Sequence, residues 1–262
     1  MITTTLQGRL GNQFYQIAML MAYAKKHNLE YYIPDVAYHC DGRKMYFPHI
    51  ANGPELPGIP EYHELQIHAT ANPDGTYNYN VPVYQDIPRM ENIKFVGYWQ
   101  TFKYFDWCRD YILEQFGLDK QYLTTSFISI HIRRGDTISM PDKHPPLPLT
   151  YYQFAVNYFL QQDPDWCFMV FSDDINWCKT QFTEQNFQST TFNFREGYTE
   201  YEDLLAMREC EHNILCYSTF GFVAAYLNRN PDKIVILPPK RFIFSGANKD
   251  FVPEYFIKLE FE

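Results

Sequence analysis

The C-terminal half of the sequence alternates strand-like and helix-like segments, and this alternation constrains the fold more than any other feature. The strand-like segments are short apolar runs, whereas the helix-like segments carry apolar residues three and four positions apart. The predicted strands are Phe127–His131, Cys167–Phe171, Thr190–Phe194, Asn213–Tyr217 and Ile234–Leu237. The helices predicted between them are Thr150–Gln161, Ile175–Phe182, Tyr201–Cys210 and Phe220–Leu227. This order predicts an α/β protein with a doubly wound parallel sheet in its C-terminal half.

The N-terminal half begins with a predicted strand, a glycine loop and a helix. Residues Ile2–Gln7 are strand-like, and apolar residues from Phe14 to Ala24 recur at helical spacing. The loop Gly8-x-x-Gly11 between them lacks the spacing of a dinucleotide-binding fingerprint. A loop that opens a helix exposes N–H groups that favour an anion, although a plain tight turn is the simpler explanation.

The rest of this half is less regular. Residues 34–88 are rich in Pro, Tyr, His and Asn without a sustained period. Long irregular insertions on a folded domain are usually functional, so we assign this one to acceptor binding. A strand at 93–98 and a helix at 104–116 follow. We place the domain boundary between residues 124 and 125.

Composition excludes several classes of protein. The formal net charge of −9 argues against a nucleic-acid-binding protein, which would carry a basic face. The start of the chain lacks the pattern of a signal peptide, and no apolar stretch reaches the length of a membrane span. The 6 cysteines are widely spaced and are interpreted as reduced core residues. We therefore expect a cytoplasmic protein without a transmembrane segment; peripheral attachment to the inner face of the membrane stays open.

Polar clusters follow three of the predicted strands, namely His131–Asp136, Ser172–Asp174 and Ser218–Thr219. The carboxyl ends of parallel strands meet at one edge of a sheet, where open α/β folds bind ligands. The adjacent guanidiniums of Arg133 and Arg134 would match the oxygens of a diphosphate. The convergence of the three clusters favours a binding site.

Each cluster alone has a simpler explanation. An arginine can pair with Asp136 and close a turn. Asp173 or Asp174, like Ser218 or Thr219, can cap the helix that follows.

At these residues the sequence resembles the α-1,2-fucosyltransferases of glycosyltransferase family 11. The resemblance implies a GT-B-like fold of two facing Rossmann-like domains, with residues 1–124 on the acceptor side and residues 125–262 binding GDP-fucose. It also implies inverting, metal-independent transfer of L-fucose to the 2-hydroxyl of a galactose-terminated oligosaccharide or lipid-linked glycan. The matching segments are Gly8–Phe14, His131–Asp136, Phe171–Asp174 with Trp177–Cys178, Asp203–Met207 and Ser218–Leu227.

The resemblance also implies roles for individual residues. Arg133 would hold the β-phosphate and the leaving oxygen, with His131 and Arg134 supporting the phosphates or the loop. Asp203 would accept hydrogen bonds from the guanine edge. The remaining donor-binding candidates are Gly11 and Asn12 from the other domain, and Asp173, Ser218 and Thr219 at the sheet edge.

The charge that develops on the leaving GDP also indicates a role for Arg133. The only Asp-x-Asp, Asp163-Pro164-Asp165, precedes a strand and is interpreted as a turn, so we expect neither a metal nor another cofactor. Arg133 would then neutralise the charge that grows on GDP. The acceptor hydroxyl needs a base; Asp136 is the first candidate, although it can equally anchor the arginines.

Two other functions stay open at this point. One is a GT-B transferase that uses another nucleotide-sugar or makes another linkage. The other is a non-catalytic protein that binds a nucleotide or a sugar at the same sheet edge.

Overall fold

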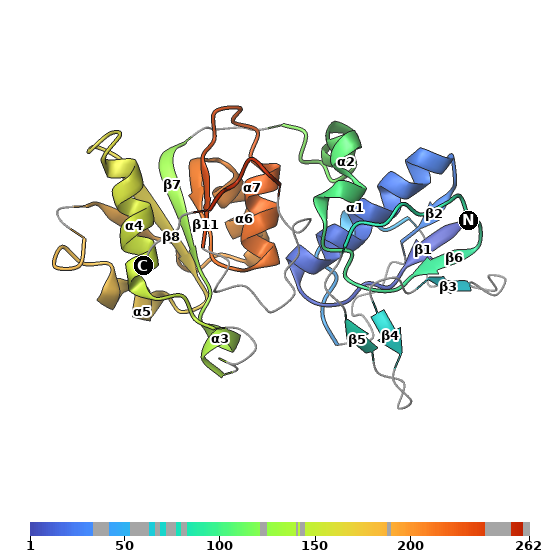
Figure 1. Ribbon diagram of the computed structural model, residues 1–262, viewed down its shortest axis with the longest axis horizontal. Helices are drawn as coiled ribbons and strands as arrows, with labels where there is room; N and C mark the ends of the chain where they lie inside the picture. Colours follow the sequence, from blue (N-terminus) through green and yellow to red (C-terminus); the bar gives the residue numbers. More distant parts are fainter. Residues whose placement is uncertain are drawn as a thin grey trace. The chain divides into compact units, whose positions relative to one another are not determined.

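The computed structural model describes residues 1–33, 42–52, 63–65, 69–71, 77–79, 83–120, 125–139, 141, 145–187, 190–238 and 253–258. The chain divides into two compact units, built mainly on Met1–Lys120 and on Gln121–Gly246. Each unit contains its own parallel β-sheet (Figure 1). The boundary expected after residue 124 stays a prediction.

The first unit has a 4-stranded parallel sheet in the order β2-β1-β6-β3, with the long helix α1 (Leu10–His27) packed on it. Its strands are β1 (Ile2–Thr4), β2 (Tyr31–Tyr32), β3 (His63–Leu65) and β6 (Ile93–Phe95). A separate antiparallel pair consists of β4 (Ala69–Ala71) and β5 (Tyr77–Tyr79). The short helices are η1 (Pro48–Ile50), η2 (Phe102–Tyr104), η3 (Asp106–Cys108) and α2 (Arg109–Gln115).

The elements predicted at 93–98 and 104–116 are only partly right. Strand β6 ends at Phe95, because the chain then takes positive φ angles at Gly97 (136°) and Trp99 (53°), which leave the extended region. The predicted second helix is divided into two 3₁₀ turns before α2. Much of the insertion at 34–88 lies outside the described residues, so its assignment to acceptor binding stays a prediction.

The second unit has a 6-stranded sheet in the order β12-β11-β10-β7-β8-β9, and every pair in it is parallel. Its strands are β7 (Thr125–Ile132), β8 (Cys167–Ser172), β9 (Phe192–Phe194), β10 (Cys210–Ile214), β11 (Val235–Leu237) and β12 (Ile257–Lys258). Its helices are α3 (Gly135–Ser139), α4 (Leu149–Leu160), α5 (Ile175–Gln181), α6 (Glu200–Arg208) and α7 (Thr219–Leu227). Figure 1 shows α4 and α5 on one face of this sheet and α6 and α7 on the other. The predicted α/β class and doubly wound parallel sheet are confirmed.

The central strand β7 is buried in its second half, which explains its apolar sequence. Ile128, Ile130 and Ile132 are at most 2% exposed and share a core with Tyr151 and Phe159 of α4. This packing fixes the strand ends that carry the polar clusters.

The prediction for the fourth strand is wrong by several residues. Strand β10 is Cys210–Ile214, where the sequence suggested the end of a helix and a strand from Asn213 to Tyr217. The cause is a buried polar network: the Asn213 amide donates to Ser129 Oγ (2.7 Å) and accepts from the Asn228 amide (3.1 Å). Because these polar side chains are satisfied inside the core, a polar segment forms a central strand. Residues 215–218 therefore lie in the turn beyond the sheet.

Candidate functional site

The strand order in the second unit reverses between β7 and β10, giving the 3-2-1-4-5-6 arrangement of dinucleotide-binding folds. Ligands in such folds bind in the crevice beyond the carboxyl ends of the strands at this switch point. The two chain segments there lie against each other, since Cys216 Sγ is 3.4 Å from His131 Nδ1. The residues after β7 and β10 are therefore the candidate site.

Arg133, the first residue after β7, forms an ion pair with Asp136 in the first turn of α3. Its Nε donates to Asp136 Oδ1 at 2.7 Å, and its Nη2 donates to Oδ2. The Arg133 side chain retains 28% of its exposure, so the guanidinium is still open to a ligand. Of the two roles considered for Asp136, this geometry favours the anchor over the base.

Arg134 has different partners from Arg133. Its Nε donates to Asp174 Oδ2 at 3.0 Å, and its guanidinium carbon lies 3.7 Å from the centroid of the Trp177 ring. The two adjacent guanidiniums are thus bound to different carboxylates. Arg134 braces the loop against α5, and of these two arginines Arg133 is the one that remains at the crevice.

Asp173 holds the turn that follows β7. Its Oδ1 accepts from the backbone N–H of Arg134 (2.7 Å), and its Oδ2 accepts from that of Gly135 (3.0 Å). A Cβ added to Gly135 would lie 2.8 Å from this second oxygen, so a side chain there would displace the Asp173 carboxylate from the turn. Asp174 caps α5 by accepting from Trp177 N at 3.2 Å.

His131 is buried at the end of β7, with 8% of its surface exposed. Burial, and secondarily the Arg133 charge, lower the pKa of its imidazole to about 3. The ring lies 5.3 Å from that of Phe220, and a Cβ on Gly221 would approach its Nδ1 to 2.6 Å. A neutral, enclosed histidine packs β7 against α7 and carries no charge to a phosphate.

Ser218 and Thr219 begin α7 at the same edge. Ser218 is the N-cap, and its hydroxyl accepts from Phe220 N at 3.3 Å. The capping role considered from the sequence is therefore present. The start of α7 follows β10 at the carboxyl edge of the sheet, and a helix N-terminus favours an anion.

Asp203 lies in the first turn of α6 and pairs with an arginine that the sequence analysis did not single out. Arg195, directly after β9, donates from Nε to Asp203 Oδ1 at 3.1 Å. Its guanidinium carbon lies 3.2 Å from the centroid of the Tyr198 ring. No sequence motif includes Arg195. Its position beside Asp203 is set by the point at which β9 ends.

Gly11 and Asn12 belong to the first unit, as the second and third residues of α1. The side-chain Oδ1 of Asn12 accepts from the side-chain Nε2 of Gln100 at 2.9 Å. Gly8 has a φ of 76°, and a Cβ there would lie 2.3 Å from the Asn12 amide nitrogen. Gly8 and Gln100 thus position Asn12, and its contact with a donor stays a prediction.

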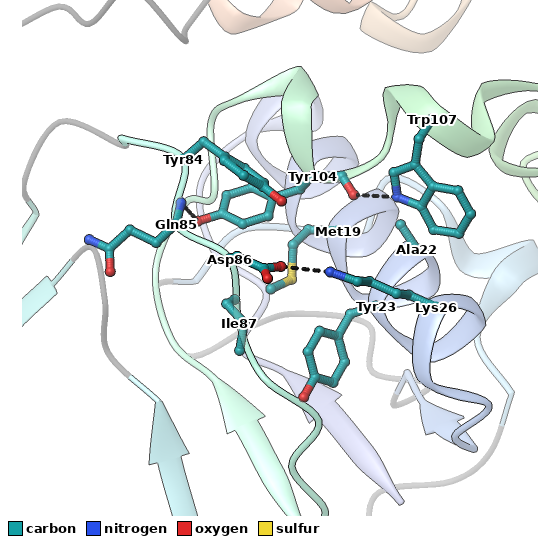
Figure 2. Close-up of a pocket in the computed structure, with 10 residues that line it drawn as sticks. All are labelled: Met19, Ala22, Tyr23, Lys26, Tyr84, Gln85, Asp86, Ile87, Tyr104 and Trp107. Atoms are coloured by element: carbon teal, nitrogen blue, oxygen red, sulfur yellow. Dashed lines mark hydrogen bonds and ion pairs between the residues drawn. The ribbon is translucent and has the colours of Figure 1, made fainter.

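A separate pocket of about 330 Å³ lies in the first unit between α1 and the segment before β6 (Figure 2). Its walls are mainly apolar and aromatic, and Lys26 and Asp86 form an ion pair of 2.6 Å across it. It contains no residue of the predicted set. The lining residues are Met19, Ala22, Tyr23, Lys26, Tyr84, Gln85, Asp86, Ile87, Tyr104 and Trp107.

The remaining sequence expectations concern metals, cysteines and membranes. Asp163 and Asp165 form a turn, with Asp165 N donating to Asp163 Oδ1 at 2.9 Å, as predicted. Within the described ranges, no group of three or more His, Cys, Asp or Glu could hold a metal, and no helix is long and apolar enough to cross a membrane. Cysteines 108, 167, 178, 210 and 216 are free thiols, while Cys40 lies outside the described residues.

Comparisons with known proteins place the chain in a family. The model of the family described as "Glycosyl transferase family 11" matches residues 83–246. An alpha-1,2-colitosyltransferase of Escherichia coli is 31% identical over 183 residues, covering 64% of this chain and 63% of that protein.

Two more distant proteins are also similar. The galactoside alpha-(1,2)-fucosyltransferase 1 of Mus musculus is 26% identical over 249 residues, covering 86% of this chain and 63% of that enzyme. The solved structure of POFUT1 with GDP-fucose has a TM-score of 0.49 at 12% identity, covering 88% of this chain and 94% of that one. The chain thus spans less than two thirds of the length of either sequence relative. With the family model covering more than half of its residues, the chain belongs to glycosyl transferase family 11.

Proposed function

We propose that this protein transfers L-fucose from GDP-fucose to the 2-hydroxyl of a terminal galactoside, with inversion at the anomeric carbon. The observation that carries the proposal is the partly exposed guanidinium of Arg133 at the switch point of a 3-2-1-4-5-6 sheet, at the edge where α7 begins. The names of both sequence relatives support the α-1,2 linkage, and one of them names a galactoside.

The reaction follows from this arrangement. The acceptor 2-hydroxyl oxygen bonds to the anomeric carbon as the bond from that carbon to the β-phosphate oxygen breaks. The bonding electrons leave with GDP, and the hydroxyl proton passes to a base. Arg133 donates hydrogen bonds to the leaving phosphate and stabilises its growing charge. The remaining phosphate oxygens lie at the start of α7, where Ser218, Thr219 and the positive end of the helix dipole favour negative charge.

Four other predicted residues act through Arg133 in this proposal. Asp136 fixes the direction of the guanidinium, Asp173 fixes the turn, and Arg134 ties that turn to α5. His131 supplies an uncharged packing surface under the loop. These groups need no reorganisation when charge develops on GDP, which is the requirement for electrostatic catalysis.

Asp203→Asn is expected to weaken GDP binding at least about tenfold. Two guanine N–H groups need acceptors, and an amide offers one acceptor and one donor in place of two. An unpaired polar group at a half-buried site costs about 1–3 kcal/mol. Calorimetry gives the GDP dissociation constant, and a melting curve separates this effect from instability. Unchanged affinity with a lowered melting temperature would mean that Asp203 only stabilises α6.

Transfer is expected to continue in EDTA, because Arg133 supplies the positive charge that a metal would otherwise provide. The measurement is turnover in chelator-treated protein, with and without added manganese or magnesium. Loss of turnover in EDTA that either ion restores would contradict the metal-free mechanism.

Calorimetric titration with GDP, UDP and ADP tests the donor half of the proposal. GDP is expected to bind at least about tenfold more tightly than the other two. Equal affinities would mean that the sheet edge recognises only a diphosphate.

A second candidate donor differs only in its sugar. The bacterial relative, at 31% identity, is named for colitose transfer, so colitose can replace fucose. Parallel assays with the two activated sugars decide between them.

A further inference from the structure

Arg195 and Asp203 form an ion pair at the carboxyl edge of the 6-stranded sheet, where the edge strand β9 ends. Their side chains are 22% and 24% exposed, so the pair is largely enclosed but still reaches the surface. Arg195 is held in place twice, by its Nε bond to Asp203 and by stacking on Tyr198. Its backbone N–H also donates to Val170 O at 2.9 Å, which continues the β8–β9 ladder.

The pair leaves hydrogen-bonding atoms unused on both partners. The Arg195 Nε is occupied, whereas Nη1 and Nη2 have no hydrogen-bond partner among the described residues. On Asp203 the bond to Arg195 occupies Oδ1, and Oδ2 has no partner in the same part of the chain. Donors and an acceptor therefore lie side by side on a rigid pair.

We propose that Arg195 reads the guanine base of the donor nucleotide together with Asp203. This inference rests on the proposed function, in which Asp203 accepts from the guanine edge. The Watson–Crick edge of guanine presents the O6 acceptor next to the N1–H and N2–H donors. Arg195 Nη donates to O6, while Asp203 accepts from N1–H and N2–H through Oδ2 and the second lone pair of Oδ1.

The position of the pair suits a nucleotide whose phosphates lie at Arg133. Strand β8 separates β9 from β7, and neighbouring strands are about 4.8 Å apart, so the pair lies about 10 Å along the edge from the end of β7. A ribose between base and diphosphate spans a gap of this size. The β-phosphate end of the donor is then the part nearest to Ser218 and Thr219, which follow β10 on the other side of β7.

Adenine mismatches the same pair at both positions. Its N6 amino group would meet the Arg195 donors, and its N1 acceptor would meet the Asp203 carboxylate. The pair thus binds guanine through matched hydrogen bonds. It disfavours adenine because two polar contacts would be left unsatisfied.

The test is calorimetric titration of the full chain with GDP and ADP, in the wild type and in Arg195→Leu. We expect GDP to bind at least about tenfold more weakly to the variant, while ADP affinity changes less than about twofold, so that the preference for guanine falls by the same factor. A second variant, Arg195→Lys, keeps a positive charge beside Asp203. It therefore tests the same contact if Arg195→Leu fails to fold. Its flexible ammonium cannot donate to Asp203 and to a base in one fixed geometry, so the same loss of preference is expected.

Lys179→Leu is the matched control, because it removes a cation from the exposed pair with Glu196 in the same unit. It should leave the preference unchanged. A variant of Arg195 that retains the wild-type preference, or that weakens GDP and ADP equally, would overturn the inference. A wild-type protein that binds GDP no better than ADP would instead overturn the proposed donor.

Discussion

Arg133→Ala is expected to lower transfer at least about a hundredfold while the protein still folds. Arg133 is the one arginine of its motif that the loop leaves open to the crevice, and removing a donor to the developing oxyanion costs about 3 kcal/mol in the transition state. Steady-state kinetics with a fixed galactoside, together with a melting curve, measure both effects. Turnover close to the wild-type value in a folded variant would contradict the role of Arg133.

Three further variants isolate the cause. Arg133→Lys should also fail, because a compact ammonium does not replace the bidentate fork. Arg89→Ala removes an exposed arginine paired with Glu91 and should have no effect on transfer. Asp136→Asn should lower the rate of transfer less than Arg133→Ala does. The fall in rate at acid pH should also remain in this variant. A loss of about a thousandfold, with the fall at acid pH no longer seen, would identify Asp136 as the base.

Acid is expected to destabilise the wild-type protein through His131. The folded state holds the pKa of His131 at about 3, whereas an unfolded histidine titrates near 6.5. Below pH 6.5 the unfolded chain binds the proton and the folded chain does not, so stability falls as the pH drops from about 6.5 toward 3. At pH 5 the single site accounts for about 2 kcal/mol.

The difference between pH 7 and pH 5 in urea unfolding measures this effect. His131→Asn should lose about 2 kcal/mol less than the wild type over this interval. His63→Asn, at an exposed strand position, is the control and should behave as the wild type does. The same pH dependence in wild type and His131→Asn would show that His131 is protonated in the folded state.

The parts of the fold that follow from apolar periodicity were predictable. Strand β7 is apolar because both of its faces are covered, and β8 and its helix follow the same rule. Strand β10 was misplaced because its polar residues are satisfied by partners far away in the sequence, such as Ser129 and Asn228. Periodicity carries no information about such a network.

The location of the candidate site could be predicted from the sequence, but not which carboxylate each arginine binds. Polar clusters at strand ends indicated the edge of the sheet at which the candidate residues would gather, and the structure places them there. The sequence could not show that Arg133 and Arg134 take different carboxylates, because that choice depends on how the loop meets α5. Nor could it show Arg195, whose partner lies on the next helix and whose stacking residue lies in the loop between them.

The most direct test of the account is the product of the reaction itself. The full chain is incubated with GDP-fucose and a galactose-terminated oligosaccharide, and the product is analysed by nuclear magnetic resonance. We expect a single new fucose, α-linked to the 2-hydroxyl of the terminal galactose, together with one equivalent of GDP. Release of GDP without any fucosylated product, or fucose at another hydroxyl, would contradict it.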